Sequence, residues 1–227
     1  RSSYGFLAKY AKIYQIFGSI GTGHVLSDGF RAACSVGREP ARDIAGADEL
    51  SAALQLERVS GLCMRGYLQN QLLRDIDAVS MAHSLEVRVP FLDPAIVDLA
   101  LSLPIDAKLG DVTRLPDPTA ATYRETGTKR ILVDIGRELL PEGMDQQKKR
   151  GFAMPFDVWL KGPLREVLED TLSESSVKRR GLFNYKHTAA LRKGVLEGRT
   201  GWPQPWLLMM TELWCREVLD HRNEMRR

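Results

Sequence analysis

The spacing of apolar residues limits what this chain can fold into more than any other feature. Near the amino terminus Phe6, Tyr10, Ile13 and Phe17 recur every three or four positions, and similar spacing continues along most of the chain. This period is that of an amphipathic α-helix, whereas a half-buried strand shows strict alternation of apolar and polar residues. Segments that alternate are few. We therefore predict a mainly α-helical chain.

The expected helices follow from where this period starts and stops. They cover residues 6–17, 48–84, 94–103, 129–140, 156–172, 186–196 and 205–222. We expect residues 48–84 to form either one long helix or two helices that are separated near Gly61 or Gly66. Residues 24–47 show only a weak pattern and read as a surface connection. Residues 108–128 are rich in turn-forming residues, which predicts a long loop, and long loops in compact domains are often functional.

Composition excludes several classes of function. The chain has 227 residues, of which 44% are hydrophobic and 27% charged, as in ordinary globular proteins. The net charge is only +3, and the basic clusters lack the interleaved aromatic residues of a nucleic-acid platform. No apolar run approaches the roughly 20 residues that span a bilayer. We therefore expect neither a nucleic-acid nor a membrane partner.

The cysteines point to a reducing compartment. Cys34, Cys63 and Cys215 are odd in number and widely separated, and no histidine lies near them at the spacing of metal ligands. We therefore expect reduced thiols in a cytoplasmic protein, and no metal site.

The stretch SMAHSLEVRVPFLD (80–93) places two charged side chains among apolar ones. In an extended segment successive side chains point to opposite faces, so Glu86 and Arg88 share one face and the flanking valines share the other. Asp93, followed by proline, is a good helix start. We therefore expect a short extended passage that leads into a helix, with its charged face held by polar partners in a buried setting.

Four motifs in a fixed order resemble the asparagine synthetase family. They are YLQNQLLRDID (67–77), SMAHSLEVRVPFLD (80–93), GTKRIL (127–132) with LLP after it, and KKRGFAMPFDVWLKGPLRE (148–166). Together they resemble the carboxyl-terminal part of the ATP-dependent half of glutamine-hydrolysing asparagine synthetase. The resemblance is specific over residues 67–166. Residues 1–66 and 167–227 are expected to be helical flanks, so that 1–227 forms one partial asparagine synthetase-like domain.

The resemblance implies a fold and an activity. The chain would be the helical carboxyl-terminal portion of an adenine-nucleotide α-hydrolase-like (ATP pyrophosphatase) α/β domain, whose parallel sheet lies mostly upstream. Family members use ATP and magnesium to adenylate the side-chain carboxylate of aspartate and release pyrophosphate. Ammonia, supplied from glutamine by an amino-terminal glutaminase domain, then displaces AMP to give asparagine. The resemblance implies that aspartate, ATP and glutamine-derived ammonia are bound through domains that this chain lacks. Whether the protein forms a homodimer is left open.

The resemblance also implies site residues. Lys129 matches the family's active-site lysine, and a positioned cation stabilises the negative charge that develops on oxygen in both steps. Without the motif, Lys129 would be a solvent-facing lysine at a helix start, where the helix dipole disfavours a cation. Lys149, Gly151 and Phe152 match the Lys-x-Gly-Phe element, which is either a flexible turn near the cleft or a basic surface loop. Asp77 matches an acidic position, for which a structural role is favoured.

Other residues of the motifs are assigned mainly structural roles. We interpret Glu86 and Arg88 as a buried polar clamp that shapes the wall of the cleft, rather than as catalytic groups. His83 is interpreted as a boundary residue rather than as a general base. Asn70 and Gln71 stand where many family members carry acids, which weakens any assignment of a carboxylate base in that segment.

The nucleotide-binding motifs of the family are absent. The family's Ser-Gly-Gly-x-Asp-Ser loop, whose backbone donors cradle pyrophosphate, does not occur here. This chain therefore has no dedicated motif for ATP or magnesium. The first residue is Arg1 rather than methionine, which favours a fragment of a longer synthetase. Two alternatives remain open: a non-catalytic helical binding module derived from the scaffold, and an adenylating ligase that acts on another carboxylate.

Overall fold

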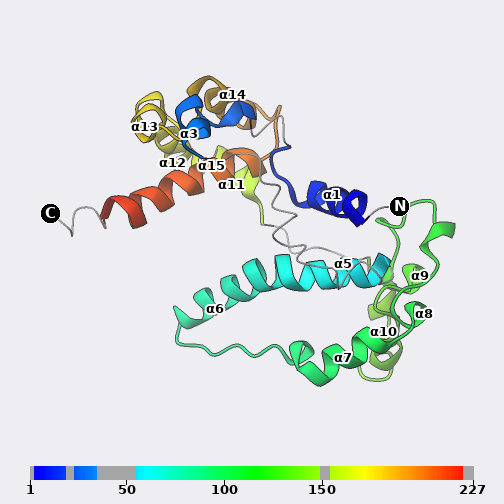
Figure 1. Cartoon of the computed structure of the whole chain (residues 1–227). Coiled ribbons are helices and arrows are strands. Elements are labelled where there is room, and N and C mark those ends of the chain that lie inside the picture. Colours follow the sequence, from blue (N-terminus) through cyan, green and yellow to red (C-terminus); the bar gives the residue numbers. More distant parts are fainter. Residues whose placement is uncertain (1–2, 19–22, 35–54, 149–153, 222–227) are drawn as a thin grey trace. The chain divides into compact units, whose positions relative to one another are not determined.

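The computed structural model describes residues 3–18, 23–34, 55–148 and 154–221 (Figure 1). The prediction of a mainly α-helical chain is confirmed, because the described residues form helices and their β contacts are two isolated bridges, Leu26–Phe183 and Thr122–Lys148. Within these ranges no helix is long and apolar enough to cross a membrane. The chain divides into two compact units. Unit 1 comprises residues 1–43 and 153–227, and unit 2 comprises residues 44–152.

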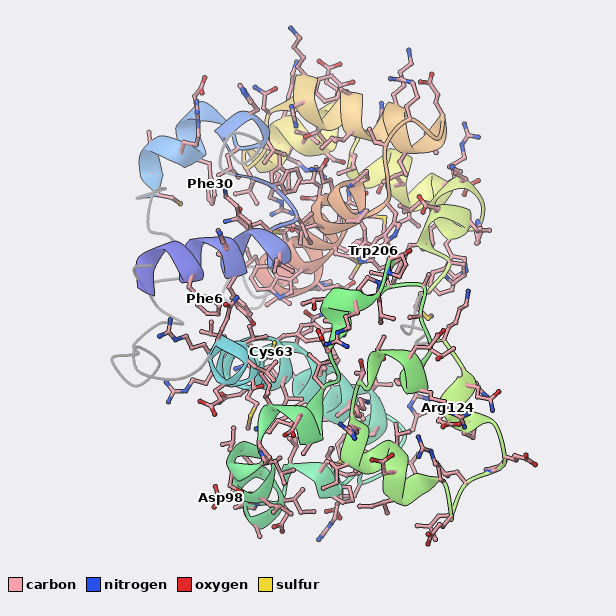
Figure 2. The ribbon with its side chains drawn as sticks, turned by 90° about the vertical axis from the view of Figure 1, so that its right-hand side faces the viewer. Phe6, Phe30, Cys63, Asp98, Arg124 and Trp206 are labelled. Carbon is pink, nitrogen blue, oxygen red and sulfur yellow. The ribbon has the colours of Figure 1, made fainter. Side chains whose placement is uncertain are left out.

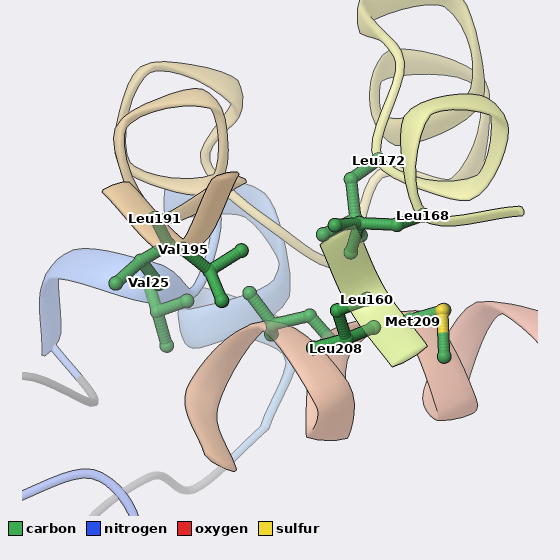
Figure 3. Close-up of a cluster of buried hydrophobic side chains, with 8 residues drawn as sticks. All are labelled: Val25, Leu160, Leu168, Leu172, Leu191, Val195, Leu208 and Met209. Carbon is green, nitrogen blue, oxygen red and sulfur yellow. The ribbon is translucent and has the colours of Figure 1, made fainter. Parts of the chain in front are cut away.

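Unit 1 is a set of short helices around one apolar core. Figure 3 shows the core, in which eight buried side chains meet: Val25, Leu160, Leu168, Leu172, Leu191, Val195, Leu208 and Met209. Phe156 adds an aromatic layer, with its ring centroid 4.4 Å from those of both Trp202 and Trp206. The helices are α1 (Ser3–Tyr14), α3 (Asp28–Ala33), α11 (Phe156–Lys161), α12 (Arg165–Thr171), α13 (Glu174–Arg180), α14 (Tyr185–Leu196), α15 (Pro203–Trp214) and the π-helix η6 (Cys215–Asp220).

The prediction of a single helix over 156–172 is wrong. The structure has α11 and α12 instead, and they are separated at Gly162. The next residue is Pro163, and a residue that precedes proline is disfavoured in the helical conformation. Helix α13 was not predicted, because it is short and has few apolar residues. Its two ends are stabilised by capping residues. The Ser173 hydroxyl accepts a hydrogen bond from the backbone nitrogen of Ser176, and Gly181 ends the helix with a positive φ of 72°.

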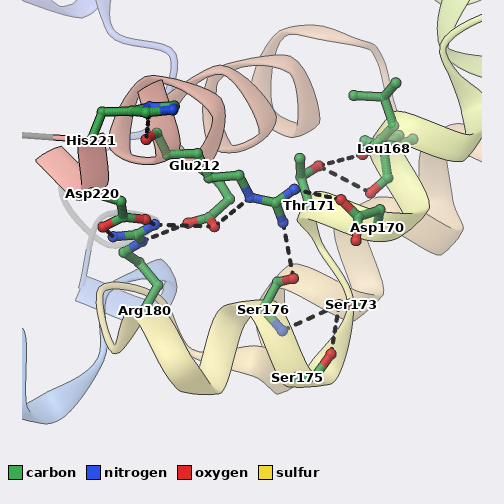
Figure 4. A network of polar contacts seen from close by, with 12 residues as sticks. Leu168, Asp170, Thr171, Ser173, Ser175, Ser176, Arg180, Glu212, Asp220 and His221 are labelled. Atoms are coloured by element: carbon green, nitrogen blue, oxygen red, sulfur yellow. Dashed lines mark hydrogen bonds and ion pairs between the residues drawn. The ribbon is translucent and has the colours of Figure 1, made fainter. Parts of the chain in front are cut away.

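An ionic network around the buried carboxylate of Glu212 joins α13 to α15 and η6 (Figure 4). Glu212 is only 3% exposed. Its carboxylate accepts hydrogen bonds from Arg180 Nε at 2.8 Å and from Arg216 Nε at 2.9 Å. Arg180 also donates to Asp220 at 2.7 and 3.0 Å, which raises the pKa of Arg180 and lowers that of Asp220. One carboxylate with two guanidiniums therefore links elements that are distant in sequence.

Unit 2 begins with one long helical rod. Helix α5 (Gln55–Cys63), the π-helix η2 (Met64–Leu72) and α6 (Leu73–Met81) follow one another without interruption. Of the two predicted alternatives, one long helix is confirmed over the described residues, and no break occurs at Gly61 or Gly66; the chain passes through Gly66 with wider π turns. The side-chain amide of Asn70 donates to the carbonyl of Arg65 at 2.8 Å, five residues earlier. Residues 48–54 of this predicted helix lie outside the described residues.

The rest of unit 2 returns from α6 through an extended passage, as Figure 1 shows. It contains η3 (Pro90–Leu92), α7 (Pro94–Ser102), α8 (Ile105–Lys108), η4 (Val112–Arg114), α9 (Tyr123–Thr126), α10 (Arg130–Gly136) and η5 (Met144–Gln146). The predicted start of α7 is confirmed, with the Asp93 carboxylate accepting from Ala95 N at 2.9 Å. The predicted loop over 108–128 is partly wrong, because α9 forms there on a capping box between Thr122 and Glu125.

Candidate functional site

The turn that carries Lys129 is formed by a close approach of two backbone segments. Gly127 has a φ of +58°, and Gly110 N donates to the carbonyl of Thr126 at 3.1 Å. A Cβ atom on Gly127 would lie 2.7 Å from the backbone nitrogen of Gly110, closer than such atoms approach. Glycine at 127 is therefore required both by the left-handed backbone and by the lack of space. This contact sets where the chain enters α10.

Lys129 itself has a left-handed backbone, with φ of 57° at the residue preceding α10. A left-handed conformation is costly for a residue with a side chain, and such strain is often found at functional sites. The side chain is exposed. Among the described residues its ammonium group has no hydrogen bond or ion pair, so the cation is available to a ligand.

Lys129 lies at the edge of two hollows in unit 2. One, of about 390 Å³, is lined by α10 and by the segment that follows it, including Arg124, Arg137 and Asp145. The other is an apolar groove of about 560 Å³ between α5, α7, α8 and α10. The other lysine of the groove, Lys108, donates to the carbonyl of Leu101 at 3.2 Å. Lys129 is therefore the lysine of the groove whose ammonium is not already engaged by the described chain.

Asp145 organises the first of these hollows. Its side chain is 7% exposed. It accepts from Arg124 Nε and Nη2 at 2.7 and 3.0 Å and from Arg137 Nε at 3.1 Å, so η5 is tied to both α9 and α10. Arg124 is labelled in Figure 2. The hydrogen bonds from Arg124, with a further contribution from Arg137, hold the pKa of Asp145 below its ordinary value.

Replacing Asp145 by asparagine should remove an acid-sensitive part of the stability of unit 2. Because the folded state lowers the pKa of Asp145, the stabilisation is complete above the ordinary value near 3.8 and is lost as the pH falls through the lower folded-state value. At neutral pH, hydrogen exchange over residues 123–147, corrected for intrinsic rates, should be faster in Asp145→Asn than in the wild type. The difference should shrink in acid.

Asp98→Asn serves as the control for this experiment, because Asp98 is an exposed residue of α7 (labelled in Figure 2). We expect its exchange to follow the wild type at every pH. If Asp145→Asn and the wild type show the same pH response, the Arg124–Asp145–Arg137 cluster does not stabilise the site.

Glu86 and Arg88 form an ion pair in the extended passage. Arg88 Nε lies 2.8 Å from Glu86 Oε1, but the two side chains are 83% and 70% exposed, respectively. The expectation of a buried clamp is therefore wrong for the described chain. The physical reason is that no described element covers this passage: the flanking Val87 and Val89 are also exposed. An exposed pair of this kind contributes at most about 1 kcal/mol.

The remaining motif residues are not brought together with Lys129. Asp77 is exposed on α6, and neither hollow at Lys129 is lined by Asp77, Glu86 or Arg88. His83 Nδ1 donates to the carbonyl of Val79 at 2.9 Å, at the end of α6, as a boundary residue does. Lys149, Gly151 and Phe152 lie outside the described residues. The described chain of unit 2 ends at Lys148, which bridges to Thr122 next to α9.

Sequence reasoning missed the Arg124–Asp145–Arg137 cluster altogether. Its members are 8 and 21 positions apart, a separation that no local pattern marks. The Thr-x-x-Glu signature of the capping box at Thr122 was readable and would have located α9. In the part of the chain that the structure describes, no group of three or more histidine, cysteine, aspartate or glutamate side chains is arranged to hold a metal ion.

Comparison with known proteins identifies the family. The family described as asparagine synthase matches residues 8–216, which is most of the chain. This chain therefore belongs to the asparagine synthase family, and the predicted resemblance is confirmed. No solved structure matches it significantly.

Three curated relatives illustrate the match. Asparagine synthetase [glutamine-hydrolyzing] 1 of Bacillus subtilis is 28% identical over 127 residues, covering 56% of this chain and 18% of that protein. A putative asparagine synthetase [glutamine-hydrolyzing] of Mycobacterium tuberculosis (strain H37Rv) is 29% identical over 160 residues, covering 68% and 22%. A putative asparagine synthetase [glutamine-hydrolyzing] 1 of Methanocaldococcus jannaschii is 35% identical over 83 residues, covering 31% and 15%. The chain thus spans about a fifth of the length of the first two.

Proposed function

We propose that this chain is part of an ATP-dependent amidoligase that makes asparagine from aspartate, with ammonia drawn from glutamine. The observation that carries this proposal is the family match over residues 8–216, together with relatives named as glutamine-hydrolysing asparagine synthetases. In the proposed reaction an aspartate carboxylate oxygen attacks the α-phosphorus of ATP, and pyrophosphate leaves. Ammonia then attacks the acyl carbon of the adenylate, AMP leaves with the bonding electrons, and the nitrogen loses a proton.

Lys129 is the residue of this chain to which we assign chemistry. Both steps place negative charge on oxygen atoms, and a cation held in position stabilises that charge. Three features of Lys129 support this assignment: its exposed ammonium group has no partner among the described residues, its backbone is left-handed, and it lines two hollows. We assign Lys149 and Gly151 to the same cleft on the motif alone.

ATP and magnesium belong to the proposed reaction, but the described residues fit only part of that requirement. Lys129 offers a cation for a phosphate group. A magnesium ion needs several oxygen ligands, and no cluster of three metal-ligating side chains occurs among the described residues. We therefore assign no magnesium ligand to the described part of this chain.

The exposed apolar surface of unit 2 supports a larger parent domain. Val79, Leu85 and Phe91 are each more than 60% exposed, and they are among many exposed large apolar side chains between residues 76 and 105. An accumulation of exposed apolar side chains is typical of a surface that packs against another part of a protein. We propose that this surface lies against the parallel sheet of an ATP pyrophosphatase-like domain in the full-length protein.

Pyrophosphate exchange with the full-length protein tests the proposed function. Radiolabelled pyrophosphate should enter ATP when aspartate is present, and not when aspartate is omitted or replaced by glutamate, because the first step is the reversible adenylation of one carboxylate. Exchange supported by a different carboxylate, but not by aspartate, would indicate the alternative ligase. No exchange with any carboxylate, from a protein that is folded, would support a non-catalytic binding module.

A further inference from the structure

Lys129 connects two short helices with a backbone conformation that lysine disfavours. Helix α9 ends before Gly127, α10 begins at Arg130, and the φ of Lys129 is +57°. A residue with a side chain prefers a negative φ, and a change in the sign of φ alters the direction in which Cβ leaves the backbone. The place of the ammonium group therefore depends on what keeps this backbone left-handed. Such strain persists only where the surrounding structure imposes it.

The two helices are too short to fix this turn by themselves. Helix α9 has four residues and α10 has seven. Isolated helices shorter than about 12 residues are marginal in water, so contacts with other segments must set the direction of one helix relative to the other. Two parts of unit 2 provide such contacts, and each of them reaches both helices.

The first of these parts, residues 106–110, makes its contacts through the backbone. Gly110 N donates to the carbonyl of Thr126 in α9 at 3.1 Å. The carbonyl of Asp106 accepts from Nη1 of Arg130, the first residue of α10, at 3.3 Å. The two contacts lie on either side of Lys129 in the sequence. This segment therefore holds the end of α9 and the start of α10.

The second part is the side chain of Asp145. Its carboxylate accepts from Arg124 Nε and Nη2, in α9, at 2.7 and 3.0 Å. It also accepts from Nε of Arg137, the C-cap residue of α10, at 3.1 Å. The carboxylate is buried, and its two oxygens already accept three hydrogen bonds. One side chain thus fixes the helix before the turn relative to the helix after it.

We propose that Asp145 is a positioning residue for Lys129. It holds α9 and α10 in the arrangement that keeps the Lys129 backbone left-handed, and so places the ammonium group at the edge of the two hollows. The oxygens of Asp145 are occupied by the two arginines, so we assign Asp145 no direct contact with a substrate. This inference rests on the proposed function, because the position of the cation affects turnover only if Lys129 acts on a substrate.

Asp134 offers a matched control in the same group of side chains. Its carboxylate pairs with Arg137 Nη1 at 3.2 Å and lies 3.9 Å from Arg130 Nε. Asp134 is itself a residue of α10, so these pairs act along one helix and do not connect it to α9. Asp134→Asn therefore removes the same charge as Asp145→Asn, next to the same arginine, without releasing the turn.

The backbone of Lys129 gives a direct readout that needs no enzymatic activity. In the 227-residue chain labelled with ¹³C,¹⁵N-lysine, the Cα chemical shift of Lys129 and the coupling between its HN and Hα report the sign of φ. Lys129→Arg identifies the signal. We expect a positive φ in the wild type and in Asp134→Asn, and a shift toward negative φ in Asp145→Asn. A positive φ that is unchanged in Asp145→Asn would overturn the proposal.

Turnover by the full-length protein shows whether this conformation matters for the reaction. Asp145→Asn should lower kcat for asparagine formation at least about tenfold and change the KM values less than about twofold, because a misplaced group that acts in the transition state costs rate rather than binding. In the Lys129→Gly background the same substitution should have no further effect, since the cation is gone and glycine needs no support in this conformation. Losses of equal size in both backgrounds would make Asp145 a merely structural residue.

Arg124→Gln keeps the proposal testable if Asp145→Asn does not fold. Arg124 is exposed, and its replacement leaves the buried carboxylate of Asp145 paired with Arg137, so this variant should fold. It should shift the φ of Lys129 and lower kcat in the same direction as Asp145→Asn. A folded Arg124→Gln with wild-type φ and turnover would contradict the proposal. If the full-length wild type makes no asparagine, the proposed function fails, whereas the φ of Lys129 in these variants still decides whether Asp145 holds the turn.

Discussion

Lys129→Ala should abolish asparagine formation by the full-length protein, with a fall in turnover of about a hundredfold or more. The reason is electrostatic: removing one positioned donor or cation from a developing oxyanion costs about 10²- to 10³-fold in other enzymes. The side chain of Lys129 is exposed and its ammonium group has no partner among the described residues, so its loss leaves no buried group of the described chain unsatisfied. Aspartate-dependent pyrophosphate exchange and asparagine production are the measurements.

Two companion variants distinguish chemistry from folding. Lys129→Gly also removes the cation, but glycine adopts the left-handed backbone of this position, with its φ of 57°, without a conflict at Cβ. It should be as inactive as Lys129→Ala while remaining folded. Lys108→Ala removes the other lysine of the same groove, whose ammonium already donates to Leu101, and should stay active. Full activity in Lys129→Gly would refute the assignment of Lys129 and would leave the proposed amidoligase function to be judged by pyrophosphate exchange alone.

Glu212→Ala should destabilise unit 1 by about 3–5 kcal/mol, the usual cost of removing one partner from a buried ion pair. The carboxylate of Glu212 is only 3% exposed and accepts from both Arg180 and Arg216. Its removal leaves Arg180, itself largely buried, with Asp220 as its remaining carboxylate partner. Figure 4 shows how Arg180 reaches both acids.

Tryptophan fluorescence during urea unfolding measures this loss without interference from unit 2. The chain has four tryptophans, at positions 159, 202, 206 and 214, and all of them lie in unit 1. The control is Glu169→Ala, which removes an exposed partner of Arg165 one helical turn away and should cost no more than about 0.5 kcal/mol. Equal losses in the two variants would show that the Glu212 network does not hold unit 1 together.

Local rules predicted helices better than they predicted where helices are interrupted. Helix α14 was expected over 186–196 and is found at Tyr185–Leu196, and the start of α7 follows from its aspartate cap and proline. The interruption at Gly162 was readable from the proline after it, yet the apolar period continued across that point and masked it. At Gly66 the reverse holds: the glycine suggested a possible break, but the chain continues through it as a π-helix. The period of apolar residues reports which face is buried, not how each turn is hydrogen-bonded.

At the candidate site, too, local sequence patterns predicted some features and missed others. The motif pointed to Lys129, and the structure adds that its backbone is left-handed and that two hollows meet there. The motif also pointed to Glu86 and Arg88, but burial was inferred from the valines around them. Burial depends on what covers a segment, and in the described chain this pair is exposed.

The sequence by itself determined the helical class, the capped start of α7 and the family, because these are recorded in residues that are adjacent or a few positions apart. Only the tertiary structure decided that Asp145 binds two arginines 8 and 21 positions away and that Glu212 accepts from Arg180 across 32 positions. Hydrogen bonds and ion pairs act over a few ångströms in space. They therefore join whichever residues the packing of the helices brings together, and a one-dimensional pattern holds no record of that distance.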